Sequence, residues 1–348
     1  MKIVFISRLY LPHLGGVEIH LREISAILLR MGHEVAIVTS QHDKKLSLHA
    51  EYDGVEVFRI PFEVTGNKQK TWNAIKQLQQ LFADADIVHV HDVFWWILPI
   101  YRTVKNKIFT TFHGWETQFP IPFNSKIHRL FVSKLSKGTI HVGDFIQKFY
   151  WDKPNFVTYG GINQKRFTKS QMSKKVVDNK KQKNSVMRFV FVGRLEHDTD
   201  IQLYLEFLKV LKANKIVFEV IWVGDGVLKT KCQEFGKVTG FVKNISQYIV
   251  KADFVFASSY LSILEAQCLE KIVLAFYSNR LKKEYLETFP GSKYMLIAGS
   301  IESMFTKVEQ LLSERKLLAQ MRLDAKQFAL KNTWEKVVGK YLQLWRKR

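Results

Sequence analysis

The chain has 348 residues, of which 47% are apolar and 24% charged, so it can build packed cores and is neither disordered nor fibrous. Its 53 basic and 32 acidic residues give a net charge of +21, and its two cysteines exclude a disulfide framework. The longest apolar run, 93–101, has nine residues, whereas a membrane-spanning helix needs about 20. We expect a cytoplasmic protein of two domains, without a signal peptide or a spanning segment.

Strand and helix patterns alternate through the first half of the chain, which predicts a parallel α/β domain. Strands are expected at 2–7, 34–39, 54–60, 86–91, 107–112, 139–142 and 155–158. Helices are expected at 17–31 and 72–82. The lysine-rich segment 168–187 interrupts this pattern and is interpreted as a linker or flexible loop.

The alternation then restarts, so a second α/β domain follows. Its expected strands are 188–192, 218–223, 253–257 and 272–276, and its expected helix is 201–214. An amphipathic stretch at 301–330 and a final helix at 333–348 close the chain. We expect two Rossmann-like, doubly wound domains facing across a cleft, with ligands at the carboxyl ends of the strands.

A glycine pair, Gly15-Gly16, lies between the first strand and a helix. Glycines there let the backbone approach a phosphate at the helix N-terminus, although a plain tight turn is the alternative. A dinucleotide site is not expected, because no third spaced glycine follows and the second strand ends in Thr39-Ser40 rather than in an acid.

Three histidines accompany two neighbouring strands. His89 and His91 point to one face of the first strand, Asp92 follows them, and His113 ends the next strand. A third metal ligand at suitable spacing is missing, so a metal site is not expected. His113 is better placed for a ligand cleft than for the core.

Two further residues suit a nucleotide-sugar. Arg194 follows a strand and a glycine, where a guanidinium can bind a diphosphate, or it is a surface arginine beside Glu196. Glu265 lies early in an apolar helix, where it would accept hydrogen bonds from sugar hydroxyls or simply be favoured by the helix dipole. Asp198 and Asp200 form an Asp-x-Asp pair, which resembles a metal-binding motif but is more typical of a solvated loop.

Taken together, the motifs are far more specific than any one alone. They are GGVE, HVHD, TTFHGWE, VTYGGINQKRF, FVGRLE, VGDG, TGFV, KADFVFASS and LSILEAQCLEKIVLAF. In this order, and over nearly the whole chain, they resemble glycosyltransferase family 4, the retaining nucleotide-sugar enzymes of GT-B fold. The resemblance implies an acceptor-side domain over 1–165, on which helix 333–348 packs back, and a nucleotide-sugar domain over 166–332.

The resemblance also implies which residues form the site. The donor-binding positions are Gly15, Gly16, Arg194, Gly224, Val242, Ser262, Ile263, Leu264 and Glu265. The catalytic positions are His113, near the transferred sugar, with Asp92 and Glu116 on the acceptor side. The implied reaction is metal-independent hexosyl transfer from a UDP- or GDP-linked sugar to a lipid-linked, glycan or polysaccharide acceptor, with no cofactor.

Two positions depart from the family pattern. Thr199 stands where the family has a lysine, and Ala257 stands where it has its first glutamate. The first change removes a cation from a site for a diphosphate, and the second removes a contact to the donor sugar. The alternative is therefore a degenerate GT-B protein that binds a nucleotide or glycan without turnover.

The charge of +21 predicts an anionic partner. Nucleic acid is not expected, because the basic residues are scattered and no nucleic-acid motif occurs. We expect reversible docking on the inner face of the plasma membrane, in cell-envelope polysaccharide or glycolipid synthesis. Segment 126–137 has the pattern of a helix lying in an interface, or else of an ordinary surface helix. Its apolar side is Ile127, Leu130, Phe131 and Leu135, and its basic side is Lys126, Arg129, Lys134 and Lys137.

Overall fold

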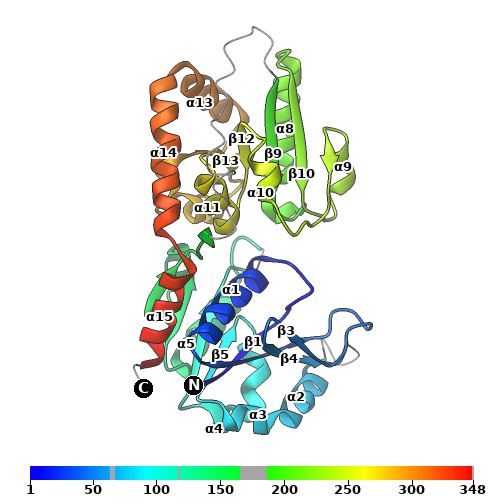
Figure 1. Ribbon diagram of the computed structural model, residues 1–348, viewed down its shortest axis with the longest axis vertical. Coiled ribbons are helices and arrows are strands. Elements are labelled where there is room, and N and C mark those ends of the chain that lie inside the picture. The colour runs from blue at the N-terminus through cyan, green and yellow to red at the C-terminus, as the bar shows by residue number, and fades with distance from the viewer. Residues whose placement is uncertain (63–66, 117, 165–185, 347–348) are drawn as a thin grey trace. The chain divides into compact units, whose positions relative to one another are not determined.

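A computed structural model describes residues 1–62, 67–116, 118–164 and 186–346. Of the segment 168–187, interpreted above as a linker, all but the last two residues lie outside this description. The chain divides into two compact units, coloured from blue to red along the chain in Figure 1. Unit 1 is Met1–Gly160 with Trp334–Arg348, and unit 2 is Gly161–Thr333. None of the described helices is long and apolar enough to cross a membrane.

Unit 1 is built on an eight-stranded sheet in the order β3-β4-β2-β1-β5-β6-β7-β8, in which the β3–β4 pair is antiparallel and every other pair is parallel. The strands are β1 Lys2–Ser7, β2 Glu34–Ser40, β3 His49–Tyr52, β4 Val55–Ile60, β5 Ile87–His91, β6 Ile108–Phe112, β7 Thr139–Val142 and β8 Phe156–Thr158. The central strands are buried almost throughout, as expected for parallel strands covered on both faces. The predicted parallel α/β domain is confirmed.

The helices of unit 1 come from both ends of the chain. They are α1 Gly16–Arg30, α2 Lys68–Gln77, α3 Gln79–Asp84, the 3₁₀ helix η2 Phe94–Ile100, α4 Tyr101–Val104, α5 Phe123–Leu135, α6 Phe145–Tyr150 and α15 Trp334–Arg346. The last of these, α15, packs against α1 and β8 (Figure 1). Its buried side chains recur at helical spacing, which is why the segment forms an amphipathic helix.

Unit 2 is built on a fully parallel six-stranded sheet in the order β11-β10-β9-β12-β13-β14. The strands are β9 Met187–Val192, β10 Phe218–Val223, β11 Lys237–Val238, β12 Phe254–Phe256, β13 Ile272–Phe276 and β14 Met295–Ala298. The helices are η4 His197–Thr199, α8 Ile201–Ala213, α9 Lys229–Gln233, α10 Ser246–Ile249, α11 Tyr260–Cys268, α12 Arg280–Glu287, η5 Ser292–Tyr294, α13 Ile301–Ser313 and α14 Arg315–Lys331.

The amphipathic stretch 301–330 is two helices rather than one. Glu314 separates α13 from α14 with φ −101° and ψ 70°, a conformation that no helix continues through. The helix expected at 72–82 is likewise divided, at Leu78, into α2 and α3. Periodicity located these segments, but it did not locate the breaks.

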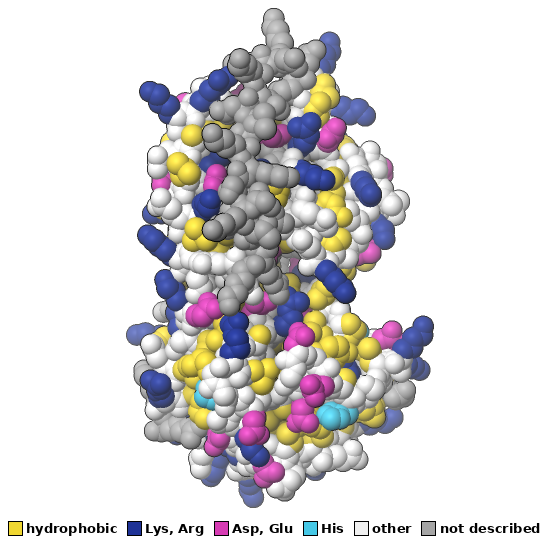
Figure 2. Space-filling model, in the orientation of Figure 1, with side chains coloured by type: hydrophobic (Ala, Val, Ile, Leu, Met, Phe, Trp, Pro, Cys, Tyr) yellow, Lys and Arg dark blue, Asp and Glu magenta, His cyan; other side chains and the backbone are white. Residues whose placement is uncertain are grey.

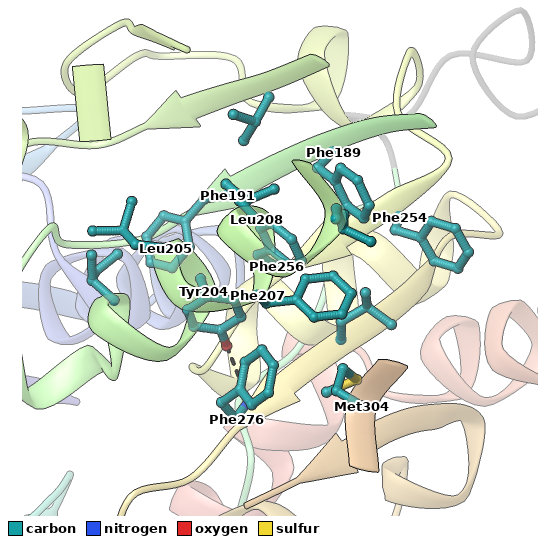
Figure 3. Packing of buried hydrophobic residues seen from close by; sticks show 14 of the residues in the cluster. Phe189, Phe191, Tyr204, Leu205, Phe207, Leu208, Phe254, Phe256, Phe276 and Met304 are labelled. Carbon is teal, nitrogen blue, oxygen red and sulfur yellow. Dashed lines mark hydrogen bonds between the residues drawn. The ribbon is translucent and has the colours of Figure 1, made fainter. Parts of the chain in front are cut away.

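Aromatic rings fill the core of unit 2 between the sheet and α8 (Figure 3). Phe189 of β9 stacks on Phe256 of β12 with ring centroids 4.8 Å apart and planes 10° apart. The ring centroid of Tyr204 of α8 lies 4.9 Å from that of Phe256 and 5.1 Å from that of Phe276. These rings pack α8 against β9 and β12, and the loops with predicted donor-binding positions follow these two strands.

Candidate active site

In unit 1, two neighbouring strands end beside each other and bring Asp92 and His113 together. Asp92 follows β5 and His113 follows β6, which pairs with β5 in parallel. The Oδ1 atom of Asp92 accepts a hydrogen bond of 3.0 Å from the His113 backbone N–H, and the Asp92 backbone N–H donates to Thr111 O. Asp92 has a φ of +63°, a left-handed conformation that bends the chain back toward the neighbouring strand. This bend is what fixes the two predicted residues next to each other.

The glycine pair lies at the start of α1, and a buried carboxylate lies beside it. A Cβ on Gly15 would come within 2.4 Å of Glu18 Oε2, whereas a Cβ on Gly16 would meet open space. Glu18 is buried in the first turn of α1 and pairs with His13 Nδ1 at 3.2 Å. Glu18 was not among the predicted site positions. The available signal was its place in the first turn, directly after the glycines.

Glu116, predicted as an acceptor-side residue, is held by an ion pair within unit 1. Its carboxylate accepts a hydrogen bond from the Tyr150 hydroxyl and lies 3.6 Å from Arg129 Nη2. Arg129 also donates to Gly114 O at 2.9 Å and stacks over the Tyr150 ring at 3.7 Å. The structure therefore places Glu116 with Arg129 and Tyr150.

The buried position of Arg129 corrects one expectation. Arg129 was predicted on the basic side of the helix at 126–137, but its side chain is buried in α5. Periodicity gave the helix correctly, and it could not show that a carboxylate from the loop after β6 pairs with one of its cations.

A hydrogen-bonded chain of buried polar groups lies beneath His113. Trp345 Nε1 donates to His89 Nδ1 at 3.0 Å, so the neutral His89 ring carries its proton on Nε2. Nε2 can then donate to Thr111 Oγ1 at 2.8 Å, Thr111 to the Tyr341 oxygen at 2.9 Å, and Tyr341 to His20 Nε2 at 2.9 Å. The first step is fixed, because an indole N–H can only donate, and each later group can then donate to the next.

Burial lowers the pKa of His20, His89 and His91 well below the usual range, and neighbouring histidines lower it further. Burial also lowers the pKa of His113, against the opposing charges of Asp92 and Glu18. The cluster is therefore neutral at pH 7. A second hydrogen bond, of 2.7 Å, joins His91 Nδ1 to His113 Nε2. His20, His89 and His91 are buried beneath His113, and none of them was a predicted site position.

In unit 2, the loop after β9 presents Arg194 at the carboxyl end of a central strand. Arg194 is exposed, and its Nη2 donates to Asp198 Oδ2 at 2.6 Å. Thr199 Oγ1 donates to the carbonyl oxygens of Arg194 and Glu196, at 2.9 and 2.7 Å, and so closes the loop. Thr199 thus supports the loop with its hydroxyl at the position where a lysine was expected.

The loop after β10 packs directly on the Arg194 loop. Gly224 has a φ of +154°, and a Cβ there would lie 1.8 Å from Gly193 O, so only glycine fits. Val242 is half-buried beyond β11, past the bridge between Gly224 and Gly240. The predicted positions Arg194 and Gly224 are therefore adjacent.

Helix α11 carries four predicted donor-binding positions, and three of them are buried. The side chains of Ile263 and Leu264 are in the core, and the Ile263 N–H already donates to Ser259 O. Ser262 bonds Ser259 through their hydroxyls at 2.8 Å. Glu265 is half-buried one turn further along. Of the four, Glu265 is the side chain with surface exposure and charge to offer a ligand.

A buried lysine outside the predicted positions lies near the Arg194 loop. Lys282, in the first turn of α12, donates to Ser258 O at 3.2 Å, and Ser258 Oγ donates to Thr199 O at 3.4 Å. Burial lowers the pKa of Lys282, while the charges of Asp200 and Asp198 oppose this and that of Arg194 adds to it. No spacing rule connects residue 282 with residue 194, so nothing along the chain indicated this proximity.

The Asp-x-Asp pair in this loop is divided between two roles. Asp198 pairs with Arg194, whereas Asp200 is buried, and burial raises its pKa. Among the described residues, no three histidine, cysteine or acidic side chains are grouped as metal ligands would be.

Comparison with known proteins gives a consistent result for both units. Residues 14–152 match the family described as Glycosyltransferase Family 4, and residues 187–314 match Glycosyl transferases group 1. The chain is similar to an uncharacterized glycosyltransferase of Methanocaldococcus jannaschii, with 24% identity over 99% of this chain and 98% of that protein.

Two further similarities are more limited. One component of the human phosphatidylinositol N-acetylglucosaminyltransferase is 28% identical over 98 residues, which are 27% of this chain and 20% of that protein. The structure of Anabaena HepE in complex with UDP and glucose aligns with a TM-score of 0.73 at 13% identity, over 99% of this chain and 98% of that chain. That likeness shows the fold.

Proposed function

Because the chain belongs to the family 4 type of glycosyltransferases and has their GT-B fold of two Rossmann-like domains, we propose that it is a retaining hexosyltransferase. Its donor is a UDP- or GDP-linked sugar, and its acceptor is a lipid-linked or glycan molecule. HepE was solved with UDP and glucose, and the human relative is named for a phosphatidylinositol acceptor, which supports both assignments.

The observation that carries the proposal is Arg194 in unit 2. The guanidinium is exposed at the carboxyl end of β9, and Asp198 engages one of its edges. Its remaining N–H donors can bind the oxygens of a diphosphate, with the close-packed backbone of Gly224 beside them. In unit 1, His113 and the start of α1 offer neutral N–H donors and a positive helix end.

In the proposed reaction the bond between the anomeric carbon and the diphosphate oxygen breaks, and the acceptor hydroxyl attacks from the same face. Negative charge develops on the leaving diphosphate, where Arg194 stabilises it. A diphosphate oxygen takes the proton of the acceptor hydroxyl, so no side chain has to act as a base. This mechanism needs no metal, and turnover should survive EDTA.

A pair of arginines at opposite ends of β9 tests the donor site. Arg194→Ala should remove about 2–4 kcal/mol of transition-state stabilisation, which is measured as the fall in kcat/KM. Arg188→Ala, at the other end of the strand, removes an exposed arginine paired with Glu219 and should leave kcat/KM within twofold. A drop below threefold for a folded Arg194→Ala protein would remove Arg194 from the site.

A panel of UDP-, GDP- and ADP-sugars identifies the donor by release of nucleoside diphosphate. Binding without release, shown by a thermal shift alone, would favour the non-catalytic protein that Thr199 and Ala257 suggest. Ala257, directly after β12, is fully buried, and its methyl side chain offers a sugar no polar group. Loss of turnover in EDTA, restored by Mg²⁺, would overturn metal independence.

We also propose that unit 1 docks on an anionic membrane through an exposed apolar surface on α5 and beyond α6. It consists of Phe123, Ile127, Phe131 and Trp151, which are 66%, 50%, 54% and 57% exposed. The first three recur every four residues, along one stripe of α5. Leu130 and Leu135, predicted on the same side, are half-buried, so the apolar stripe is rotated from the expected one.

Basic groups accompany this surface. Lys126 lies 4.4 Å over the Trp151 ring, and Lys134, Lys148 and Lys153 are exposed on or near α5 and α6. Elsewhere the basic side chains are spread over the viewed face of each unit (Figure 2). Aromatic rings flanked by lysines suit the interface of an anionic bilayer, at about 1 kcal/mol per lysine.

Flotation with anionic and neutral vesicles tests the docking surface. Ile127→Ser with Phe131→Ser should abolish binding to anionic vesicles, and Lys126→Glu with Lys134→Glu should weaken it. Leu317→Ser with Leu323→Ser is the matched control, because these leucines of α14 are 50% and 49% exposed. Equal binding to both kinds of vesicle, or equal loss in the control, would end the proposal.

A further inference from the structure

We infer that His91, which has no role in the proposed reaction, is a positioning residue that fixes the His113 ring as the tautomer protonated on Nδ1. His113 then offers an N–H donor, and not a base, on the edge of the ring that faces away from His91. The inference rests on the proposed function in one respect only, namely which ligand His113 contacts. The tautomer itself is a property of unit 1.

The two rings are locked to each other by the sheet. His91 is the last residue of β5, and its register partner on β6 is Thr111, two residues before His113. The two ring nitrogens, His91 Nδ1 and His113 Nε2, are 2.7 Å apart, and the ring planes are 30° apart. His91 is 1% exposed, whereas His113 is half-buried at the rim. His113 therefore has one free edge, and His91 has none.

The other nitrogen of His91 decides the direction of this hydrogen bond. His91 Nε2 is buried and has no hydrogen-bond partner among the described residues. Its ring is surrounded by rings, with the centroids of Phe5 at 5.4 Å, His20 at 6.0 Å and Tyr341 at 6.3 Å. If His113 donated, neutral His91 would carry its proton on Nε2 as a buried N–H without an acceptor.

Buried N–H groups without an acceptor are rarer than acceptors without a donor. The favoured arrangement is that His91 Nδ1–H donates to His113 Nε2, which leaves only a lone pair on His91 Nε2. Neutral His113 must then carry its own proton on Nδ1. In histidines generally, the hydrogen bond made by one ring nitrogen decides whether the other nitrogen carries the proton.

The surroundings keep both rings neutral. The groups that face His113 are Asp92 after β5, Glu18 and His20 of α1, and His91 itself. Tyr341 of α15 approaches His20 and His91, and burial raises the pKa of its hydroxyl, which therefore remains a donor. Burial outweighs the two carboxylates in setting the pKa of His113. Protonation of both facing nitrogens, His91 Nδ1 and His113 Nε2, is excluded, because two N–H groups would then face each other at 2.7 Å.

The protonation of each ring nitrogen can be measured directly. Long-range ¹H–¹⁵N spectra of the full chain, labelled on histidine, distinguish protonated from bare nitrogens, and His113→Gln identifies the His113 signals. We expect Nδ1 of His113 to be protonated and Nε2 bare between pH 6.5 and 8, without any substrate. A wild-type spectrum with the proton on Nε2 of His113 would overturn the inference.

Three variants separate positioning from packing. His91→Leu removes the donor, so the His113 signals should become a mixture of tautomers. His91→Asn places an amide N–H close to the original Nδ1 and should restore the single tautomer. His89→Asn is the matched control, because His89 is equally buried two residues earlier on the same strand and bonds Thr111 and Trp345 instead. An unchanged His113 tautomer in a folded His91→Leu protein would overturn the inference, as would the same change in His89→Asn.

Kinetics give the second readout, with the donor that the nucleotide-sugar panel identifies. His91→Leu should lower kcat about ten- to a hundredfold, as removal of a group that orients a histidine does, with KM changed less than threefold. His91→Asn should recover most of this loss. If the wild-type chain turns over no nucleotide-sugar, the proposed function fails while the spectra still decide the tautomer. If His91→Leu does not fold, the wild-type and His91→Asn spectra decide it.

Discussion

The two units begin alike and differ at their centres. The backbone N–H of Lys2, at the start of β1, donates to Asp86 Oδ2 at 2.9 Å, and that of Arg188, at the start of β9, donates to Asp253 Oδ2 at 2.8 Å. In return, the backbone N–H of Asp86 donates to the Lys2 carbonyl and that of Asp253 to the Arg188 carbonyl, each at 2.8 Å. One local pattern therefore joins the first strand to its inner neighbour in each half of the chain.

Toward the carboxyl ends of the same strand pairs, the units diverge. In unit 1, Phe5 of β1 faces His89 of β5 in register, and a chain of hydrogen bonds continues from His89 to α15. In unit 2, Phe191 of β9 faces Phe256 of β12, and the surroundings are aromatic. A polar core is directional and needs Tyr341 and Trp345 to satisfy it. The aromatic core depends on filled volume instead.

The largest expected effect is in the aromatic core. Phe256→Ala removes a ring that contacts Phe189 and Tyr204, and it should lower the free energy of unfolding of unit 2 by about 3–5 kcal/mol. Urea titration measures this, with the unfolding of unit 2 taken as the part of the tryptophan fluorescence change that Trp222→Phe, in unit 2, removes. Phe256→Leu keeps most of the volume and should cost less than about 1.5 kcal/mol. Equal losses for the two variants would show that volume is not what stabilises this core.

Acid should destabilise unit 1 more than unit 2. Burial lowers the pKa of His20, His89 and His91 in the folded state, so below about 6.5 the unfolded chain binds protons that the folded chain does not. Their contribution is complete above pH 6.5. It is lost as the pH falls, at about 1.4 kcal/mol per pH unit for each histidine. In unit 2 the histidine is His197, which is exposed.

Urea titrations at pH 7.5 and 5.5 check this difference. In Trp222→Phe, tryptophan fluorescence reports unit 1, and in the wild type it reports both units. The midpoint of unit 1 should fall more steeply with pH than that of unit 2. Parallel shifts of the two midpoints would show that the histidine cluster does not control acid stability.

Two tyrosines sharpen the comparison with a smaller effect. Tyr341→Phe removes the hydroxyl that bonds both Thr111 and His20, and it should cost unit 1 about 1–3 kcal/mol. Tyr204→Phe in unit 2 removes one bond, of 3.3 Å from the Phe276 N–H (dashed in Figure 3), and should cost about 1 kcal/mol. Both variants keep the ring. A larger loss for Tyr204→Phe, measured by urea titration, would contradict the contrast between the two cores.

The smallest effect belongs to a feature that the units share. Lys2 pairs with Glu34 at 3.8 Å and Arg188 with Glu219 at 3.4 Å, each pair in register between the first two strands of its unit. All four side chains are exposed, so double-mutant cycles should give coupling energies of about 0.2–1 kcal/mol or less. A coupling above about 1.5 kcal/mol in one unit alone would show that the units differ at this end too.

Much of the fold followed from patterns along the chain. Uninterrupted apolar runs such as 2–7 and 272–276 predicted buried parallel strands, because strands covered on both faces need no polar side. Within the apolar run 93–101, Phe94 and Trp96 are buried. Strand β3, His49–Tyr52, was missed because it is an antiparallel edge strand with exposed and half-buried residues.

The candidate site was predictable where residues follow strands directly. Asp92 and His113, and likewise Arg194 and Gly224, are adjacent because the carboxyl ends of neighbouring parallel strands meet at one edge. Glu116 was equally prominent in the sequence, but its pairing with Arg129 depends on how α5 lies against the loop after β6. Nothing in the local sequence carries that information.

The sequence by itself determined the alternation of strands and helices, the two-unit organisation and the residues that end each strand, since these depend on local periodicity. The tertiary structure decided which polar groups become partners: Tyr341 with His20 across 321 positions, Trp345 with His89 across 256, and Lys282 with Ser258. Hydrogen bonds are short and directional, so they depend on the final packing of α1, α12 and α15 on their sheets. Hydrophobic periodicity is a property of each segment, whereas a hydrogen-bond partner is a property of the folded molecule.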